Sequence, residues 1–182
     1  MPLEFDSKKS LLKFNWSLDN EIDNLKYLNC IEDKYIYKCI KYKDYNASVR
    51  SSASFTTGTY FFVIRIGILR CYESLAVVED EAPDVNYLAS YKHKTFIGYY
   101  NMEELIKERG NFNYLDIAIY IDMDRKKCIF YNYDKKKFLK FGKIRSDSVK
   151  LFAWLKNGGY DKEKGMIILN EGCIPIPDWV KL

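Results

Sequence analysis

The sequence is poor in the side chains on which most enzyme active sites depend. It has one histidine, His93, among 182 residues, so a Ser-His-Asp or Cys-His arrangement would have to use that residue. His93 stands in the lysine-flanked segment YKHKTF, which is typical of a solvated surface. The serines of VRSSASF have no Gly-x-Ser-x-Gly turn around them, and their alternation favours hydroxyls on the surface of a sheet. We therefore expect no enzymatic activity.

Recognisable metal and cofactor motifs are also missing. The five cysteines are widely separated and contain no C-x-x-C pair, the spacing typical of zinc and redox sites. Asp122 and Asp124 lack the glycine and the later glutamate of a calcium loop, so a hairpin turn accounts for both. The glycine-rich stretch KNGGYDKEKG lacks the Lys-Ser/Thr end of a phosphate loop. We expect neither a metal nor a cofactor.

No stretch of about 18 apolar residues is present, and the N-terminal segment carries charges where a signal peptide needs its apolar centre. With unpaired cysteines as well, these features predict a soluble protein of the cytoplasm. The excess of 29 basic over 25 acidic residues is too small to indicate nucleic-acid binding. YNYDKKKFLKFGKIR interleaves aromatic residues with lysines in a way that could bind bases and phosphates. Its aspartate and the low net charge favour a solvated hairpin tip, so we expect no nucleic acid.

The sequence is rich in aromatic and apolar residues. Apolar residues make up 48% and aromatic residues 16% of the chain, which is enough to fill the core of one domain of this length. Aromatic side chains suit the half-buried surface of a sheet. This composition favours β structure.

Short strand patterns follow one another at roughly ten-residue spacing. The segment TYFFVIRIGIL is apolar on both faces and predicts a central strand that is covered on each side. Residues 115–123 have the clearest two-residue period, and CIFYNY returns as their hairpin partner. Residues 77–93 are acidic around Pro83 and predict a surface loop. NMEELIKERG has an N-cap, a capping-box glutamate and a terminal glycine, which predict a short helix near 101–109.

These patterns predict an all-β protein, an antiparallel two-sheet sandwich with one short helix. Residues 27–182 would form the sandwich domain. Residues 1–26 are polar with scattered apolar positions, and we expect them to form an N-terminal arm.

Four stretches come in an order that is typical of one known family. ASVRSSASFTTGTYFFVIRI holds a Val-Arg pair, a turn that ends in Gly and an aromatic-rich strand, and TFIGYY holds an Ile-Gly pair. In DIAIYIDMDRKKCIFYNYDKK an aliphatic strand ends at an aspartate, turns through charged residues and returns as FY. VKLFAWLKNGGYDKEKGMIILNEG ends in Leu-Asn-x-Gly ahead of Pro175. In these features the chain from about residue 28 to 177 resembles the SPRY domain family.

The resemblance implies a bent sandwich that acts as an adaptor or scaffold module, binding a protein or peptide partner through loops at one end. In the family, these loops lie near the start of the Val-Arg segment and in the late strands. Carried over to this sequence, the partner-binding residues are Tyr42, Tyr45, Asn46, Tyr99, Tyr100, Trp154 and Tyr160. Core packing is the alternative role for each of them.

Two other functions are compatible with a two-sheet sandwich. A carbohydrate-binding protein of the galectin type could stack a sugar on Trp154, although the polar cluster that such a site needs is not visible in the sequence. A structural subunit could bury its exposed tyrosines in a larger assembly.

Overall fold

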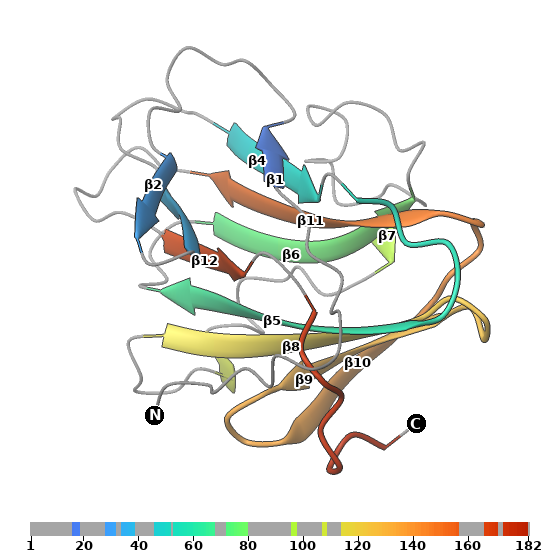
Figure 1. The fold of residues 1–182 in the computed structure, drawn as a ribbon. Coiled ribbons are helices and arrows are strands. Elements are labelled where there is room, and N and C mark those ends of the chain that lie inside the picture. Colours follow the sequence, from blue (N-terminus) through green and yellow to red (C-terminus); the bar gives the residue numbers. More distant parts are fainter. Residues whose placement is uncertain are drawn as a thin grey trace.

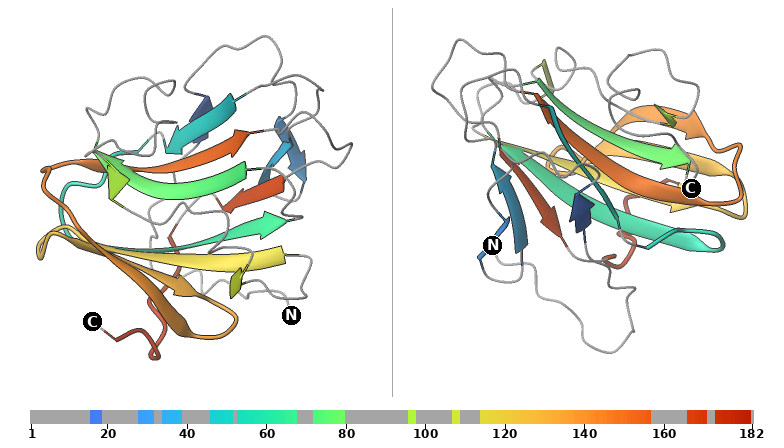
Figure 2. Two further views of the ribbon diagram at one scale, coloured as in Figure 1. Left: turned by 180° about the vertical axis from the view of Figure 1, so that it is seen from behind. Right: turned by 90° about the horizontal axis from the view of Figure 1, so that it is seen from above.

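The computed structural model shows two antiparallel sheets stacked as the layers of a sandwich (Figures 1 and 2). It describes residues 16–18, 28–31, 34–38, 46–51, 53–67, 72–79, 96–97, 107–108, 114–156, 166–170 and 173–181. Within these ranges every strand pair is antiparallel. No helix in the described part of the chain is long and apolar enough to cross a membrane. The all-β sandwich predicted from the sequence is confirmed.

The smaller sheet has five strands. In spatial order they are β1 (Trp16–Leu18), β4 (Asn46–Ser51), β11 (Val149–Lys156), β6 (Tyr72–Glu79) and β7 (Phe96–Ile97). The larger sheet has seven strands. In spatial order they are β10 (Lys137–Lys143), β9 (Lys127–Asn132), β8 (Tyr114–Asp122), β5 (Thr59–Gly67), β12 (Met166–Asn170), β3 (Lys34–Lys38) and β2 (Leu28–Ile31).

The core lies between the two sheets and is built by the two-residue period of the strands. Alternate residues of β5 and β8 point inward and meet alternate residues of β6 and β11. The members of this inner cluster include Phe62, Ile64, Leu75, Val77, Ile117, Ile119, Ile121, Phe130 and Leu151, all at most 2% exposed. Phe55 closes the cluster at one end, with its ring 5.1 Å from that of Phe62.

A second apolar cluster covers the outer face of the seven-stranded sheet. The other set of alternate residues in β5, β8 and β9 points outward, including Phe61, Tyr120 and Tyr131. The C-terminal segment, residues 173–181, lies across them (Figure 1) and contributes Ile174 and Val180. This explains why β5 is apolar on both faces, as its sequence predicts: both of its faces are buried.

Two expectations are wrong. The surface loop predicted for residues 77–93 begins too early, because Val77 and Val78 are fully buried in β6, a strand that lies between β11 and β7. The acidic residues after Val78 are typical of a loop, so the sequence did not indicate that the strand extends this far. Ser51 does not carry its hydroxyl on the sheet surface: it is fully buried in β4.

Two further expectations concern segments that the structure describes only in part. Of the helix expected near 101–109, Lys107 and Glu108 are helical and the rest lies outside the described residues. Of the arm expected for residues 1–26, the described part is β1, which pairs with β4 at the edge of the five-stranded sheet. The remainder of the arm lies outside the described residues.

Candidate functional site

Three crossings between the sheets leave from one end of the sandwich. In the five-stranded sheet, Asn46 at the start of β4 is the register partner of Lys156 at the end of β11, and Lys156 also pairs with Tyr72 at the start of β6. In the seven-stranded sheet, Met166 at the start of β12 pairs with Lys38 and Gly67, the last residues of β3 and β5. The connections 39–45, 68–71 and 157–165 join these ends. Their residues lie outside the described part of the chain.

This topology bears directly on the predicted binding residues. Asn46 and Trp154 lie on neighbouring strands, since Trp154 pairs with Ser48, two residues after Asn46. Tyr42, Tyr45 and Tyr160 belong to the connections and lie outside the described residues. Tyr99 and Tyr100 also lie outside them; they follow β7, which pairs with Val77 and Val78 near the other end of β6. The structure thus brings the β4 and β11 parts of the predicted site together.

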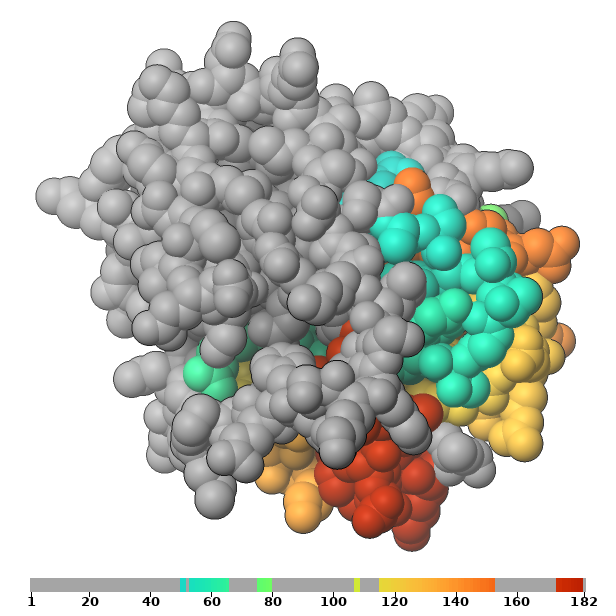
Figure 3. Space-filling model, viewed as in Figure 1, coloured from blue at the N-terminus to red at the C-terminus, as the bar shows by residue number. Residues whose placement is uncertain are grey.

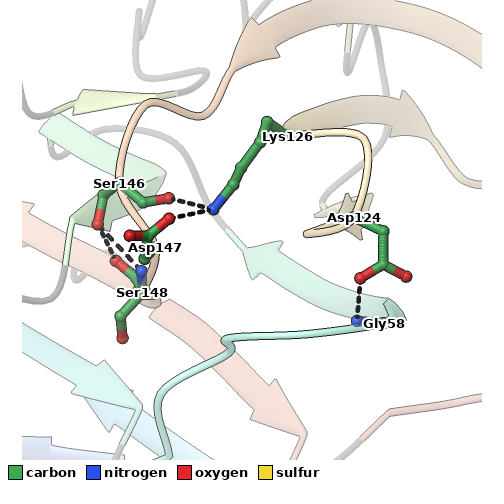
Figure 4. Close-up of polar contacts among 6 residues, drawn as sticks. All are labelled: Gly58, Asp124, Lys126, Ser146, Asp147 and Ser148. Atoms are coloured by element: carbon green, nitrogen blue, oxygen red, sulfur yellow. Dashed lines mark hydrogen bonds and ion pairs between the residues drawn. The ribbon is translucent and has the colours of Figure 1, made fainter.

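The opposite end of the sandwich is a rim of hydrogen-bonded turns (Figure 4). The amide of Gly58 donates to Asp124 Oδ1 at 3.0 Å, and the amide of Met123 donates to the Gly58 carbonyl at 2.9 Å. Lys126 Nζ donates to the Ser146 carbonyl at 3.0 Å and to Asp147 Oδ1 at 2.8 Å. The hydrogen bond from Lys126 keeps the pKa of Asp147 below its ordinary value. These contacts tie the turn before β5 to the β8–β9 turn, and that turn to the segment before β11.

Two consecutive hairpin turns have the same hydrogen bond and the same backbone conformation. After β8 the amide of Arg125 donates to Asp122 Oδ1 at 2.9 Å, and after β9 the amide of Lys135 donates to Asn132 Oδ1 at 3.0 Å. In each turn the next residue, Lys126 or Lys136, has a φ of 51°. The segments DMDRKK and NYDKKK are therefore one turn motif used twice. Sequence reasoning missed this repeat, although the spacing of Asp or Asn, then Asp, then three basic residues shows it.

Both aspartates that could suggest a cation site have turn partners. Asp122 also accepts a hydrogen bond from the Tyr120 hydroxyl at 3.1 Å. Among the described residues no group of three or more His, Cys, Asp or Glu side chains could hold a metal. Both carboxylates accept hydrogen bonds from backbone amides of the turns, in agreement with the hairpin turn predicted from the sequence.

Three buried side chains of the described region, Ser51, Cys128 and Cys173, carry an aliphatic hydroxyl or a thiol group. Ser51 Oγ donates to the Ala53 carbonyl at 2.9 Å and accepts from the Leu151 amide at 3.1 Å, so it joins β4 to β11. Burial raises the pKa of the Cys128 thiol to about 12 and that of the Cys173 thiol to about 11, which makes both poor nucleophiles near neutral pH. His93 lies outside the described residues.

No protein-family model matches the sequence, and no curated protein gives a significant match. Comparison of the structure with solved structures does give matches. One is the SPRY domain of human HERC1, with 12% identity, a TM-score of 0.51, and coverage of 76% of this chain and 87% of that one. Another is the TRIM65 PSpry domain, with 9% identity, a TM-score of 0.52, and coverage of 87% of this chain and 90% of that one. The chain has a SPRY fold.

The SPRY fold confirms the family resemblance seen in the sequence at the level of architecture. The hairpin that carried much of that resemblance, β8 to β9, holds both clusters together, since its residues face the inner core and the outer cluster in alternation. Next to β9, at one edge of the seven-stranded sheet as described, lies β10. Two phenylalanines of this strand, Phe138 and Phe141, are exposed, and both belong to the stretch YNYDKKKFLKFGKIR, whose aromatic residues interleave with lysines.

Proposed function

We propose that this protein is an intracellular, non-catalytic interaction module that binds a partner protein or peptide. Its binding surface is the end of the sandwich where β4 begins and β11 ends. The SPRY fold supports this function, because the neighbouring structures named above are themselves SPRY domains.

The observation that carries the proposal is the meeting of strand ends. Three connections between the sheets start and finish at this end, and they contain Tyr42, Tyr45 and Tyr160. Tyrosines give a large contact area at a low cost in side-chain entropy, and connections on a rigid scaffold are where binding residues concentrate. Asn46 and Trp154 lie on the strands that border these connections. Tyr99 and Tyr100 stay a prediction from the family resemblance.

Affinity capture from native lysate tests the proposal. The wild type is compared with Tyr45→Ala/Trp154→Ala and with a control, Thr56→Ala/Arg125→Ala, whose two exposed residues lie at the opposite end. We expect one discrete protein that the wild type and the control retain and the Tyr45→Ala/Trp154→Ala variant loses. Urea unfolding of each variant checks that the fold persists.

Other outcomes contradict the proposal. Retention of the protein by both variants, or its loss only from the control, places the contact elsewhere. Clear hits on a glycan array without a captured protein favour the galectin-type function. Co-purification at fixed stoichiometry that neither variant disturbs favours a structural subunit.

A further inference from the structure

The edge strand β10 exposes a pair of aromatic side chains on one face. Phe138 and Phe141 are 55% and 54% exposed, and they are the large apolar side chains found exposed among those whose burial the structure describes. Phe138 is the register partner of Tyr131 and Phe141 that of Ile129, so both lie on the outer face of the sheet. Residues three apart share a face because the register shifts between Phe138 and Lys140. The bulge thus places the two phenylalanines on one face, where regular alternation would put them on opposite faces.

The same face carries a cross-strand pair of lysines. Lys143 lies directly opposite Lys127, and lysines at these positions repel each other. Lys127 Nζ lies 5.9 Å from the centroid of the Tyr120 ring, and Lys143 is exposed. A carboxylate placed beside this pair would relieve the repulsion.

Positive charge is concentrated in this hairpin. Residues 132–145 contain six basic side chains and one acidic side chain, Asp134, so their formal charge is 6 − 1 = +5. The whole chain has a charge of +4, which leaves 4 − 5 = −1 for all other residues together. Glu108 neutralises part of this charge. Its carboxylate accepts a hydrogen bond from Lys137 Nζ at 2.6 Å, and its backbone carbonyl accepts one from Lys135 Nζ at 2.6 Å. The hairpin still keeps a positive excess that the rest of the chain does not share.

β10 is an edge strand among the strands that the structure describes. β10 pairs with β9, and no strand among the described residues pairs with its other side. Edge lysines usually prevent unwanted strand pairing, but exposed phenylalanines beside them work against that protection. The backbone donors and acceptors of an edge strand match those of another peptide chain, which can add as an extra strand. A single-stranded nucleic acid could use the lysines and the rings but not this backbone pattern.

We propose that β10 binds an extended acidic segment of a partner protein as an added strand, with the apolar side chains of that segment on Phe138 and Phe141 and its carboxylates beside Lys143. This surface is separate from the end of the sandwich proposed above to bind a partner. The two proposals can fail independently.

The test uses a fluorescein-labelled peptide of about ten residues, the length of a long strand. Every second position is Val or Glu and the positions between them are Ser, so that the Val and Glu side chains share one face of the strand. Binding to the full chain is followed by fluorescence anisotropy. We expect saturable binding that weakens as salt is raised. We also expect slower hydrogen exchange of the β10 backbone amides in the complex, which a contact through side chains alone would not produce.

Variants separate binding from folding. Phe138→Ser/Phe141→Ser should weaken binding about tenfold, the usual effect of losing interface aromatics. Lys143→Glu should also weaken binding about tenfold, yet it creates an opposite-charge pair with Lys127 and should leave the urea midpoint unchanged or higher. The control Lys150→Glu reverses a lysine of β11, in the other sheet, and should bind the peptide as the wild type does.

Three results would overturn the proposal. One is equal affinity for a peptide with Lys in place of Glu. Another is equal affinity for a peptide with Pro in place of each Val, which cannot pair as a strand. The third is tighter binding of oligothymidylate than of the acidic peptide, which would make the surface a nucleic-acid site.

Discussion

At the scale of single residues, backbone conformation determines the turns. Gly58, Lys126 and Lys136 have positive φ values of 80°, 51° and 51°. A side chain at such a position is strained, and glycine avoids that strain. Gly58 was predictable from the sequence, since Thr-Thr-Gly between two strands is a turn signal. The two lysines were not, because nothing in the residue type indicates a left-handed conformation.

Replacement of Lys136 by glycine tests this view of the turns. We expect Lys136→Gly to raise the free energy of unfolding by about 0.5–1 kcal/mol, because the strain is removed at a site that glycine accepts readily. Lys135→Gly is the comparison variant and should lower the free energy of unfolding, since glycine adds flexibility there and the hydrogen bond from Lys135 Nζ to the Glu108 carbonyl is lost. Urea unfolding measures both, and a Lys136→Gly protein less stable than wild type would refute the explanation.

Buried acidic groups make the protein sensitive to alkali. Burial, and then the hydrogen bond to Asp122, raises the pKa of Tyr120 from 10.0 to about 12. Burial raises the pKa of Cys128 from 9.0 to about 12. Each folded pKa lies above the unfolded one, so the stability that these groups contribute is complete below their ordinary pKa and is lost as pH rises through the folded pKa. We expect the free energy of unfolding to fall between about pH 9 and about pH 12.

Urea unfolding across this pH range checks the expectation. Tyr120→Phe removes one titrating group, so its stability should fall less steeply above about pH 10 than that of the wild type. Asp147→Asn is a suitable control, because its carboxylate titrates far below this range. Equal slopes for the wild type and Tyr120→Phe would show that the phenol does not contribute.

At the scale of elements, the C-terminal segment acts as a cover for the seven-stranded sheet. Trp179 packs edge-on against Tyr131, Tyr133 and Phe61, with ring centroids 5.5, 5.8 and 6.3 Å away. The Ile174 amide donates to the Phe61 carbonyl at 2.9 Å, and the Tyr131 hydroxyl donates to the Lys181 carbonyl at 3.1 Å. Figure 3 shows this segment (red) on the molecular surface. It buries the outward-facing residues of β5, β8 and β9.

Truncation of the tryptophan side chain should therefore destabilise the whole sandwich. We expect Trp179→Ala to lower the free energy of unfolding by about 2–3 kcal/mol, below the cost for a fully buried ring because Trp179 is only partly buried. Urea unfolding followed by circular dichroism measures the loss. Asp178→Ala, at the exposed neighbouring position, is the control and should change little. An unchanged midpoint for Trp179→Ala would show that the segment is not part of the cooperative fold.

Strands with a clear two-residue alternation of apolar and polar residues were predictable from the sequence. Strands with a short apolar run or a bulge were not. The strong alternation of residues 115–123 predicted β8 almost to its bounds. β6 was missed because its buried apolar run, Leu75 to Val78, is short and acidic residues follow it directly, a composition typical of a loop. The bulge in β10 is likewise absent from the pattern, since FLKFGK reads as a regular strand.

At the scale of the whole molecule, the candidate site is a product of topology. Strand patterns predicted that two sheets would form, but not that the starts of β4, β6 and β12 and the ends of β3, β5 and β11 would gather at one end. Register between strands far apart in the chain is set by packing of the whole core and cannot be deduced from one segment. The residues proposed for this site come from the family resemblance. It pointed to Asn46 and Trp154, which the structure places on adjacent strands.

Site-specific photo-crosslinking in native lysate tests the central claim most directly. p-Benzoylphenylalanine is placed at Tyr45 or Tyr160 in the connections, and at Thr56 or Arg125 on the opposite rim. The account predicts that Tyr45 and Tyr160 crosslink to the same discrete protein and that Thr56 and Arg125 do not. Crosslinks from Thr56 and Arg125, with none from Tyr45 and Tyr160, would contradict it.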